Sequence, residues 1–157
     1  MENENTIFVK NYRRNMAELV ELHRDNLIEL SEIYLASNGV RSETSNIRII
    51  RSDLHIFFEF YQKKHGNLDP KFWSKSITIK FKKFLSNKIT GHNCQATIYR
   101  IYVTVRRFAR WLSKYPEPFL MGCPTNGIKP PREPIGQWRF HTHTPQKKST
   151  SVFESDQ

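Results

Sequence analysis

The chain has 157 residues, of which 25 are Lys or Arg and 15 are Asp or Glu, so its formal net charge is +10. This length supports one domain with tails, and the 38% hydrophobic content excludes a wholly disordered chain. No apolar run approaches the about 18 residues of a membrane span, MENENTIFVK is not typical of a secretory signal, and two cysteines do not form a disulfide framework. We expect a cytoplasmic protein with no membrane partner, whose basic charge favours association with nucleic acid.

The first predicted helix covers residues 15–36, because apolar side chains recur there at spacings of three and four. This seam consists of Met16, Val20, His23, Leu27, Leu30 and Tyr34, and Asn38-Gly39 is expected to end the helix. Since the first forty residues hold seven acidic and four basic side chains, this helix is acidic. We expect its seam to pack within the chain, the alternative being a surface that binds a partner protein.

The second predicted helix covers residues 46–65 and ends at Gly66. Its main apolar stripe is Ile47, Ile50, Leu54, Phe57, Phe58 and Tyr61. Ile49, Ile56 and Phe60 fall on nearly the opposite side, which predicts burial of both faces. The acidic first helix is the nearest candidate to cover the second face.

Asp69-Pro70 is expected to cap a turn that leads into a third helix over residues 76–87. The fourth predicted helix, over residues 95–115, has the clearest periodicity. Its stripe is Ile98, Ile101, Tyr102, Val105, Phe108, Ala109 and Leu112. At 100° per residue, a cationic row lies within about 40° of the point opposite this stripe. The row consists of Arg100, Arg107, Arg110 and Lys114.

Positive charge is concentrated in the third and fourth helices. Residues 70–116 contain eleven basic and no acidic side chains, and the rest of the chain sums to −1. Cations at helical spacings can contact successive phosphates, and a helix fits the major groove of DNA. The candidate DNA-binding residues are Lys80, Lys82, Lys83, Arg100, Arg106, Arg107, Arg110 and Lys114. The alternative is a solvated basic face, or arginines paired with the acidic first helix.

Seven of the eight prolines lie between Pro116 and Pro145, which predicts an extended linker and, from residue 137, a mobile tail. The expected organisation is an acidic helical extension at 1–44, a helical DNA-binding core at 45–120, and a Pro-rich linker and disordered tail at 121–157.

No pattern of reactive side chains predicts an enzyme. His141 and His143 lack further metal ligands nearby, the six glycines are scattered, and no nucleophile elbow is present. We therefore expect no metal, no cofactor and no small-molecule substrate.

The fourth helix and its exit resemble the core-binding domain of tyrosine recombinases, the phage-integrase family. The resemblance rests on Thr97-Ile98-Tyr99-Arg100, Arg106-Arg107-Phe108, Trp111-Leu112 and the run from Cys123 to Pro131. It covers about residues 45–134. It implies an all-α, SAM-like bundle of four to five helices, here with an extra N-terminal helix and a Pro-rich C-terminal tail, that forms one jaw of a clamp around duplex DNA.

In that family a catalytic domain with a His-x-x-Arg motif and a nucleophilic tyrosine follows the linker. No histidine here begins such a motif and no tyrosine follows Tyr115, so we expect a truncated domain that does not cut DNA. The expected function is binding of double-stranded DNA in integration or recombination, as a fragment or accessory that contacts other recombinase protomers. The alternative is a helical interaction module whose N-terminal helix recruits a partner, such as an intact recombinase.

Overall fold

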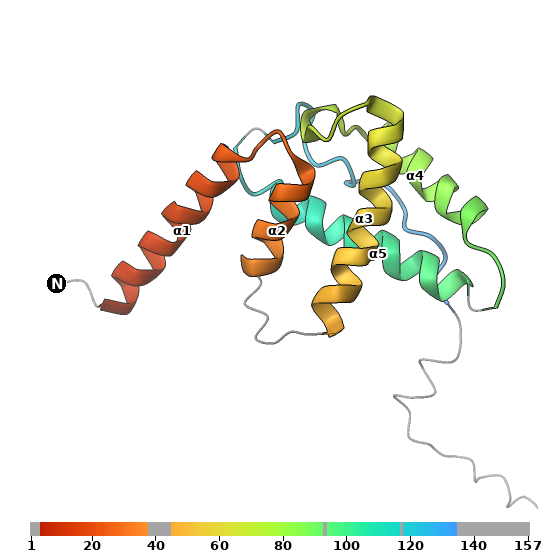
Figure 1. Cartoon of the computed structure of the whole chain (residues 1–157), viewed down its shortest axis with the longest axis horizontal. Helices are drawn as coiled ribbons and strands as arrows, with labels where there is room; N and C mark the ends of the chain where they lie inside the picture. Colours follow the sequence, from red (N-terminus) through yellow and green to blue (C-terminus); the bar gives the residue numbers. More distant parts are fainter. Residues whose placement is uncertain (1–3, 38–44, 93, 117, 135–157) are drawn as a thin grey trace, which may run out of the picture.

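The computed structural model describes residues 4–37, 45–92, 94–116 and 118–134. These residues form five α-helices and one short 3₁₀ turn, with no strand among them. The helices are α1 (Glu4–Leu22), α2 (Leu27–Ser37), α3 (Ser45–His65), α4 (Lys75–Lys88) and α5 (Cys94–Leu112), and the turn is η1 (Pro70–Phe72). The predicted all-α small bundle is confirmed (Figure 1).

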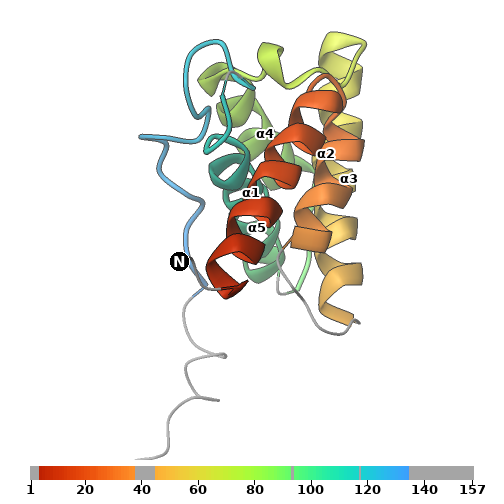
Figure 2. The ribbon, with the colours of Figure 1, turned by 90° about the vertical axis from the view of Figure 1, so that its left-hand side faces the viewer.

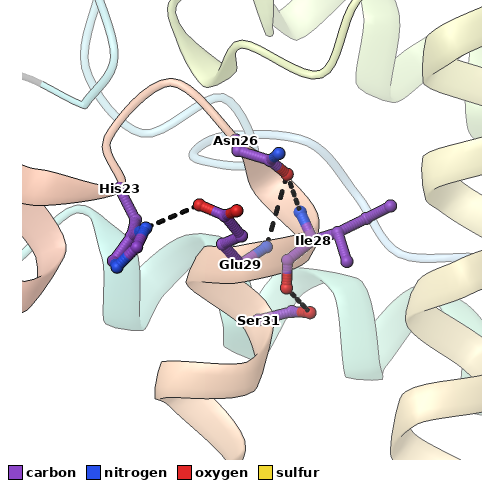
Figure 3. Close-up of polar contacts among 5 residues, drawn as sticks. All are labelled: His23, Asn26, Ile28, Glu29 and Ser31. Carbon is purple, nitrogen blue, oxygen red and sulfur yellow. Dashed lines mark hydrogen bonds and ion pairs between the residues drawn. The ribbon is translucent and has the colours of Figure 1, made fainter.

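The prediction of a single first helix over residues 15–36 is wrong, because the chain breaks into α1 and α2 (Figure 3). Asn26 causes the break: its side-chain oxygen accepts hydrogen bonds from the backbone N–H groups of Ile28 and Glu29, at 3.0 and 3.3 Å. An asparagine used in this way starts a new helix. The His23 ring contacts the Glu29 carboxylate across the break. The predicted stop at Asn38-Gly39 lies outside the described residues.

Helix α1 extends away from the other helices in Figure 1 and packs mainly against α2. Met16 and Val20 are buried as the seam predicts, whereas Leu22 on the same helix is 73% exposed. The seam continues in α2 through the buried Leu27 and Leu30. The N-terminal helices therefore bury their predicted stripe within the chain, although they bury it as two separate rods.

The predicted burial of a second face of α3 is correct at Phe60, which is 5% exposed, and the cover there differs from expectation. Phe60 lies 5.3 Å from Phe81 and 5.0 Å from Phe84, measured between ring centroids, so α4 covers this side. The N-terminal helices do not cover it: α2 packs elsewhere on α3, where Arg51 donates two hydrogen bonds to Glu32. Ile49, predicted for the same face, is 43% exposed.

The turn and the last two helices follow their predicted signals, except that α5 ends at Leu112, three residues before the predicted end at residue 115. The Asp69 side chain accepts a hydrogen bond from the backbone N–H of Lys71, and Ser74 caps α4 in the same way through Ile77. All seven residues of the predicted α5 stripe are buried. Gly66 has a positive φ of 76°, which suits the stop after α3.

The segment 118–134 is non-helical, as its prolines predict, but it packs against the helices. Phe119 and Cys123 are buried in the same core as α2 to α5. Two side chains hold its backbone: Lys82 donates to the carbonyl of Lys129 at 2.7 Å, and Gln95 donates to that of Arg132 at 2.6 Å. Figure 2 shows the segment on the side of α5 away from α2 and α3. We call residues 118–134 the strap.

The buried residues on both sides of residue 45, where the sequence suggested a boundary, belong to this one core. The predicted tail from residue 137 lies outside the described residues. No helix in the described part of the chain is long and apolar enough to cross a bilayer.

Candidate nucleic-acid interface

Three exposed cations lie on the outer face of α5 and in the turn that follows it. Arg107 and Arg110 project from the side of α5 opposite the buried stripe, and Lys114 lies in the turn just after the helix ends at Leu112. Among the residues that the structure describes, no carboxylate forms an ion pair with any of them. Free cations on a rigid helix are suited to bind phosphate groups. We call these three residues the α5 cation row.

Arg100 was predicted to join this row, but its guanidinium is engaged elsewhere. Its Nε and Nη2 donate to the two carboxylate oxygens of Asp53 in α3, at 3.1 and 2.9 Å. Thr104 donates a third hydrogen bond to the same carboxylate at 3.2 Å. Asp53 is 1% exposed, whereas the Arg100 side chain is 52% exposed. Arg100 therefore neutralises a buried carboxylate, and its partner lies in α3 and not in the acidic first helix.

Two further predicted cations are partly buried. Lys82 holds the carbonyl of Lys129, as described above. Arg106 is half-buried, and its Nε has no hydrogen-bond partner among the described residues. Neither side chain is as free to contact DNA as the α5 cation row.

Lys80 and Lys83, the remaining predicted residues, lie in a different place. They line a groove of about 690 Å³ between α3 and α4. This groove, the lysine groove, is lined by Glu59, Phe60, Lys63, Lys64, Lys80, Lys83, Phe84, Asn87 and Lys88. The eight predicted cations therefore do not form one surface: three lie on or just after α5, one holds the strap, one pairs with Asp53, two line this groove, and Arg106 is half-buried.

Sequence reasoning missed Lys63, Lys64 and Lys88 as members of one surface. Lys63 and Lys64 lie before residue 70, outside the acid-free stretch, so a count of charge along the chain separates them from Lys80. The sequence signal that could have indicated this surface was the pair of adjacent lysines in the last turn of α3. Only the packing of α3 against α4 places them beside the α4 lysines.

No metal site is found among the described residues, since no group of three His, Cys, Asp or Glu side chains is close enough to hold an ion. His141 and His143 lie outside the described residues. The two cysteines that the structure describes are free thiols.

Two buried tyrosines differ in the bonding of their hydroxyl groups. Tyr61 donates to the backbone carbonyl of Asp69, whereas the Tyr102 hydroxyl has no partner among the described residues. Burial raises the pKa of both phenols, with the nearby Asp69 carboxylate adding to the effect at Tyr61. Arg106 and Arg110 oppose the rise at Tyr102. Because the pKa is higher in the folded state, the contribution of each neutral phenol to stability is intact below pH about 10. This contribution is lost as the pH rises further and phenolate forms.

The two tyrosines should respond differently to removal of the hydroxyl. Tyr61→Phe is expected to lower the free energy of unfolding by about 1 kcal/mol, because a hydrogen bond is lost and the Asp69 carbonyl loses its donor. Tyr102→Phe removes only an unpaired buried hydroxyl, so stability should be unchanged or higher. Urea denaturation at pH 7 measures both, and equal losses would contradict this assignment. Each variant should also lose one of the late-ionising phenols in an alkaline absorbance titration.

Comparisons of the chain with protein-family models, with curated proteins and with solved structures found no match.

Proposed function

We propose that this protein binds double-stranded DNA through the α5 cation row, in a process of DNA integration or recombination. The observation that carries the proposal is the arrangement of α5 and its exit. Seven buried residues lie on one side of the helix, and three cations with no ion pair among the described residues lie on the other side and in the turn after it. The core fixes the backbone of the helix, so only the cationic side chains need ordering when a duplex binds. The resemblance to the core-binding domain of tyrosine recombinases supports the choice of duplex DNA and of other recombinase protomers as partners.

The spacing of the row suits a phosphate backbone. A rise of 1.5 Å per residue separates Arg107 from Arg110 by about 4.5 Å along the helix axis. Arg107 and Arg110 lie about one turn apart on α5, and Lys114 lies in the non-helical turn that follows the helix. An α-helix has the width to enter the major groove, where the same cations can contact the flanking phosphates. The proposal concerns binding only and includes no catalytic step.

A fluorescence anisotropy titration with a duplex of about 20 base pairs, at salt concentrations from about 50 to 200 mM, tests the proposal. Three phosphate contacts predict a slope of log affinity against log salt of about −2.7. Arg107→Gln with Arg110→Gln should make this slope shallower by about 1.8 and weaken binding at least tenfold at the lowest salt. Both residues are exposed, so the fold should be unaffected.

The matched control is Arg13→Gln with Arg14→Gln, which removes the same charge from exposed positions on α1. This control should retain nearly all duplex affinity and the full salt slope. The proposal fails if the wild-type protein does not bind duplex at low salt, or if the two double variants lose affinity equally.

A further inference from the structure

We propose that the lysine groove between α3 and α4 is a separate binding site for single-stranded nucleic acid. The groove belongs neither to the α5 cation row nor to the Asp53–Arg100 contact. Its lining comes from the C-terminal half of α3 and from the face of α4 that packs beside it. Its volume of about 690 Å³ is within the range of sites that hold small organic ligands or a few nucleotides.

The charge of the groove calls for an anionic occupant. Five lysines line it, against the single carboxylate of Glu59. A solvated helix surface normally interleaves the two signs, because neighbouring like charges repel. Five ammonium groups around one depression are stabilised when an anion with several charges lies between them. A strand of nucleic acid supplies such charges at regular intervals.

The floor of the groove distinguishes a single strand from a duplex. Phe84 is partly buried, and its ring centroid lies 5.0 Å from that of Phe60. The Lys64 ammonium lies 5.8 Å from the Phe60 centroid, and the Lys88 ammonium lies 5.4 Å from the Phe84 centroid. Aromatic rings beside cations provide both contacts that a single strand makes, stacking of a base and pairing of a phosphate. A duplex keeps its bases stacked inside and cannot offer them to Phe84.

The lysines of α4 form a row that suits an extended strand. Lys80, Lys83 and Lys88 span two turns of the helix, about 12 Å along its axis. Lys82, between them in sequence, lies on another side of α4 and holds the strap. The lysine groove therefore uses only the α4 lysines that lie beside α3. It is independent of the duplex contact proposed for α5.

The test uses fluorescein-labelled oligo(dT) of about 12 nucleotides in anisotropy titrations, with the salt concentration varied. Lys80→Gln with Lys83→Gln should weaken binding about tenfold and make the salt slope shallower by about 1.4, since each single-strand phosphate contact contributes about 0.7. The matched control is Lys71→Gln with Lys75→Gln, which removes two exposed lysines outside the groove and should change affinity less than about twofold. Circular dichroism confirms that both variants remain helical.

Phe84→Leu separates stacking from charge. This variant keeps the apolar bulk and every cation, so the salt slope should be unchanged, while oligo(dT) affinity should fall about fivefold through loss of the aromatic face. The Arg107→Gln, Arg110→Gln protein should retain oligo(dT) binding, even if duplex binding is lost or was never present. Failure of the duplex proposal therefore leaves this one standing.

Three results would overturn the inference. The first is equal loss of oligo(dT) affinity in the groove variant and in the Lys71, Lys75 control, which would indicate general charge attraction. The second is unchanged affinity in the Phe84→Leu protein. The third is a competition result in the Arg107→Gln, Arg110→Gln protein: unlabelled duplex and unlabelled single strand would displace labelled oligo(dT) at the same competitor concentration.

Discussion

Arg100→Ala is expected to lower the free energy of unfolding by about 2–3 kcal/mol, although the sequence pattern predicts that this arginine contacts DNA. The substitution leaves the Asp53 carboxylate, which is 1% exposed, with only the Thr104 hydroxyl as a partner. Breaking a buried ion pair typically costs about 3–5 kcal/mol. The expected loss is smaller here because half of the Arg100 side chain is exposed and solvent screens the pair.

Urea denaturation of the Arg100→Ala protein measures this loss directly. Arg107→Ala, on the exposed side of the same helix, is the matched control and should change stability by no more than about 0.5 kcal/mol. Combining Arg100→Ala with Asp53→Asn should recover part of the stability, because the second change removes the unpaired charge. If Arg100→Ala leaves stability intact and weakens duplex binding instead, the residue is a DNA contact and the structural role assigned to it is wrong.

Phe57→Ala is expected to produce the largest loss of stability of any change proposed for this protein, about 3–5 kcal/mol. Phe57 is completely buried at the centre of the aromatic core. Its ring lies 4.4 Å from that of Trp73 and 4.9 Å from that of Phe81, so it joins α3 to the turn after η1 and to α4. Truncation leaves a cavity that rigid aromatic neighbours fill poorly.

A loss of this size is a large part of the about 5–15 kcal/mol that holds a typical domain folded. Thermal and urea denaturation should show a clear fall in midpoint for Phe57→Ala. Ile79→Ala is the control, since Ile79 lies on the exposed side of α4 with 56% of its surface accessible. It should change stability by less than about 0.5 kcal/mol. Similar losses in the two variants would contradict the assigned core.

Periodicity predicted the helices whose stripe is continuous and one-sided. Every residue of the α5 stripe is buried, because a spacing of three and four residues places those side chains on one face whatever surrounds the helix. The same rule failed between residues 23 and 26, where the apolar spacing continues across a break. The deciding signal was local: Asn26 prefers to cap a helix, and the hydrophobic pattern does not record that preference.

The site depends more strongly on tertiary structure, so less of it was accessible from sequence. Arg100 is exposed on α5, but its partner Asp53 is 47 residues away in the chain, and no spacing rule links them. The lysine groove has the same property. Lys63 and Lys80 become neighbours only because aromatic side chains pack α3 against α4. A count of charge along the chain gives the number of basic residues. It does not show that the fold divides them among separate faces.

The way in which the helices hold the strap determines which positions can vary in sequence. Lys82 and Gln95 bind the main-chain carbonyls of residues 129 and 132, and every amino acid has such a carbonyl. Substitution of Lys129 or Arg132 therefore leaves both hydrogen bonds available, whereas substitution of Lys82 or Gln95 removes a donor. Two helical residues that precede the strap contacts by 47 and 37 positions thus help to fix its path, together with its own buried Phe119 and Cys123, while the side chains of Lys129 and Arg132 are free to change.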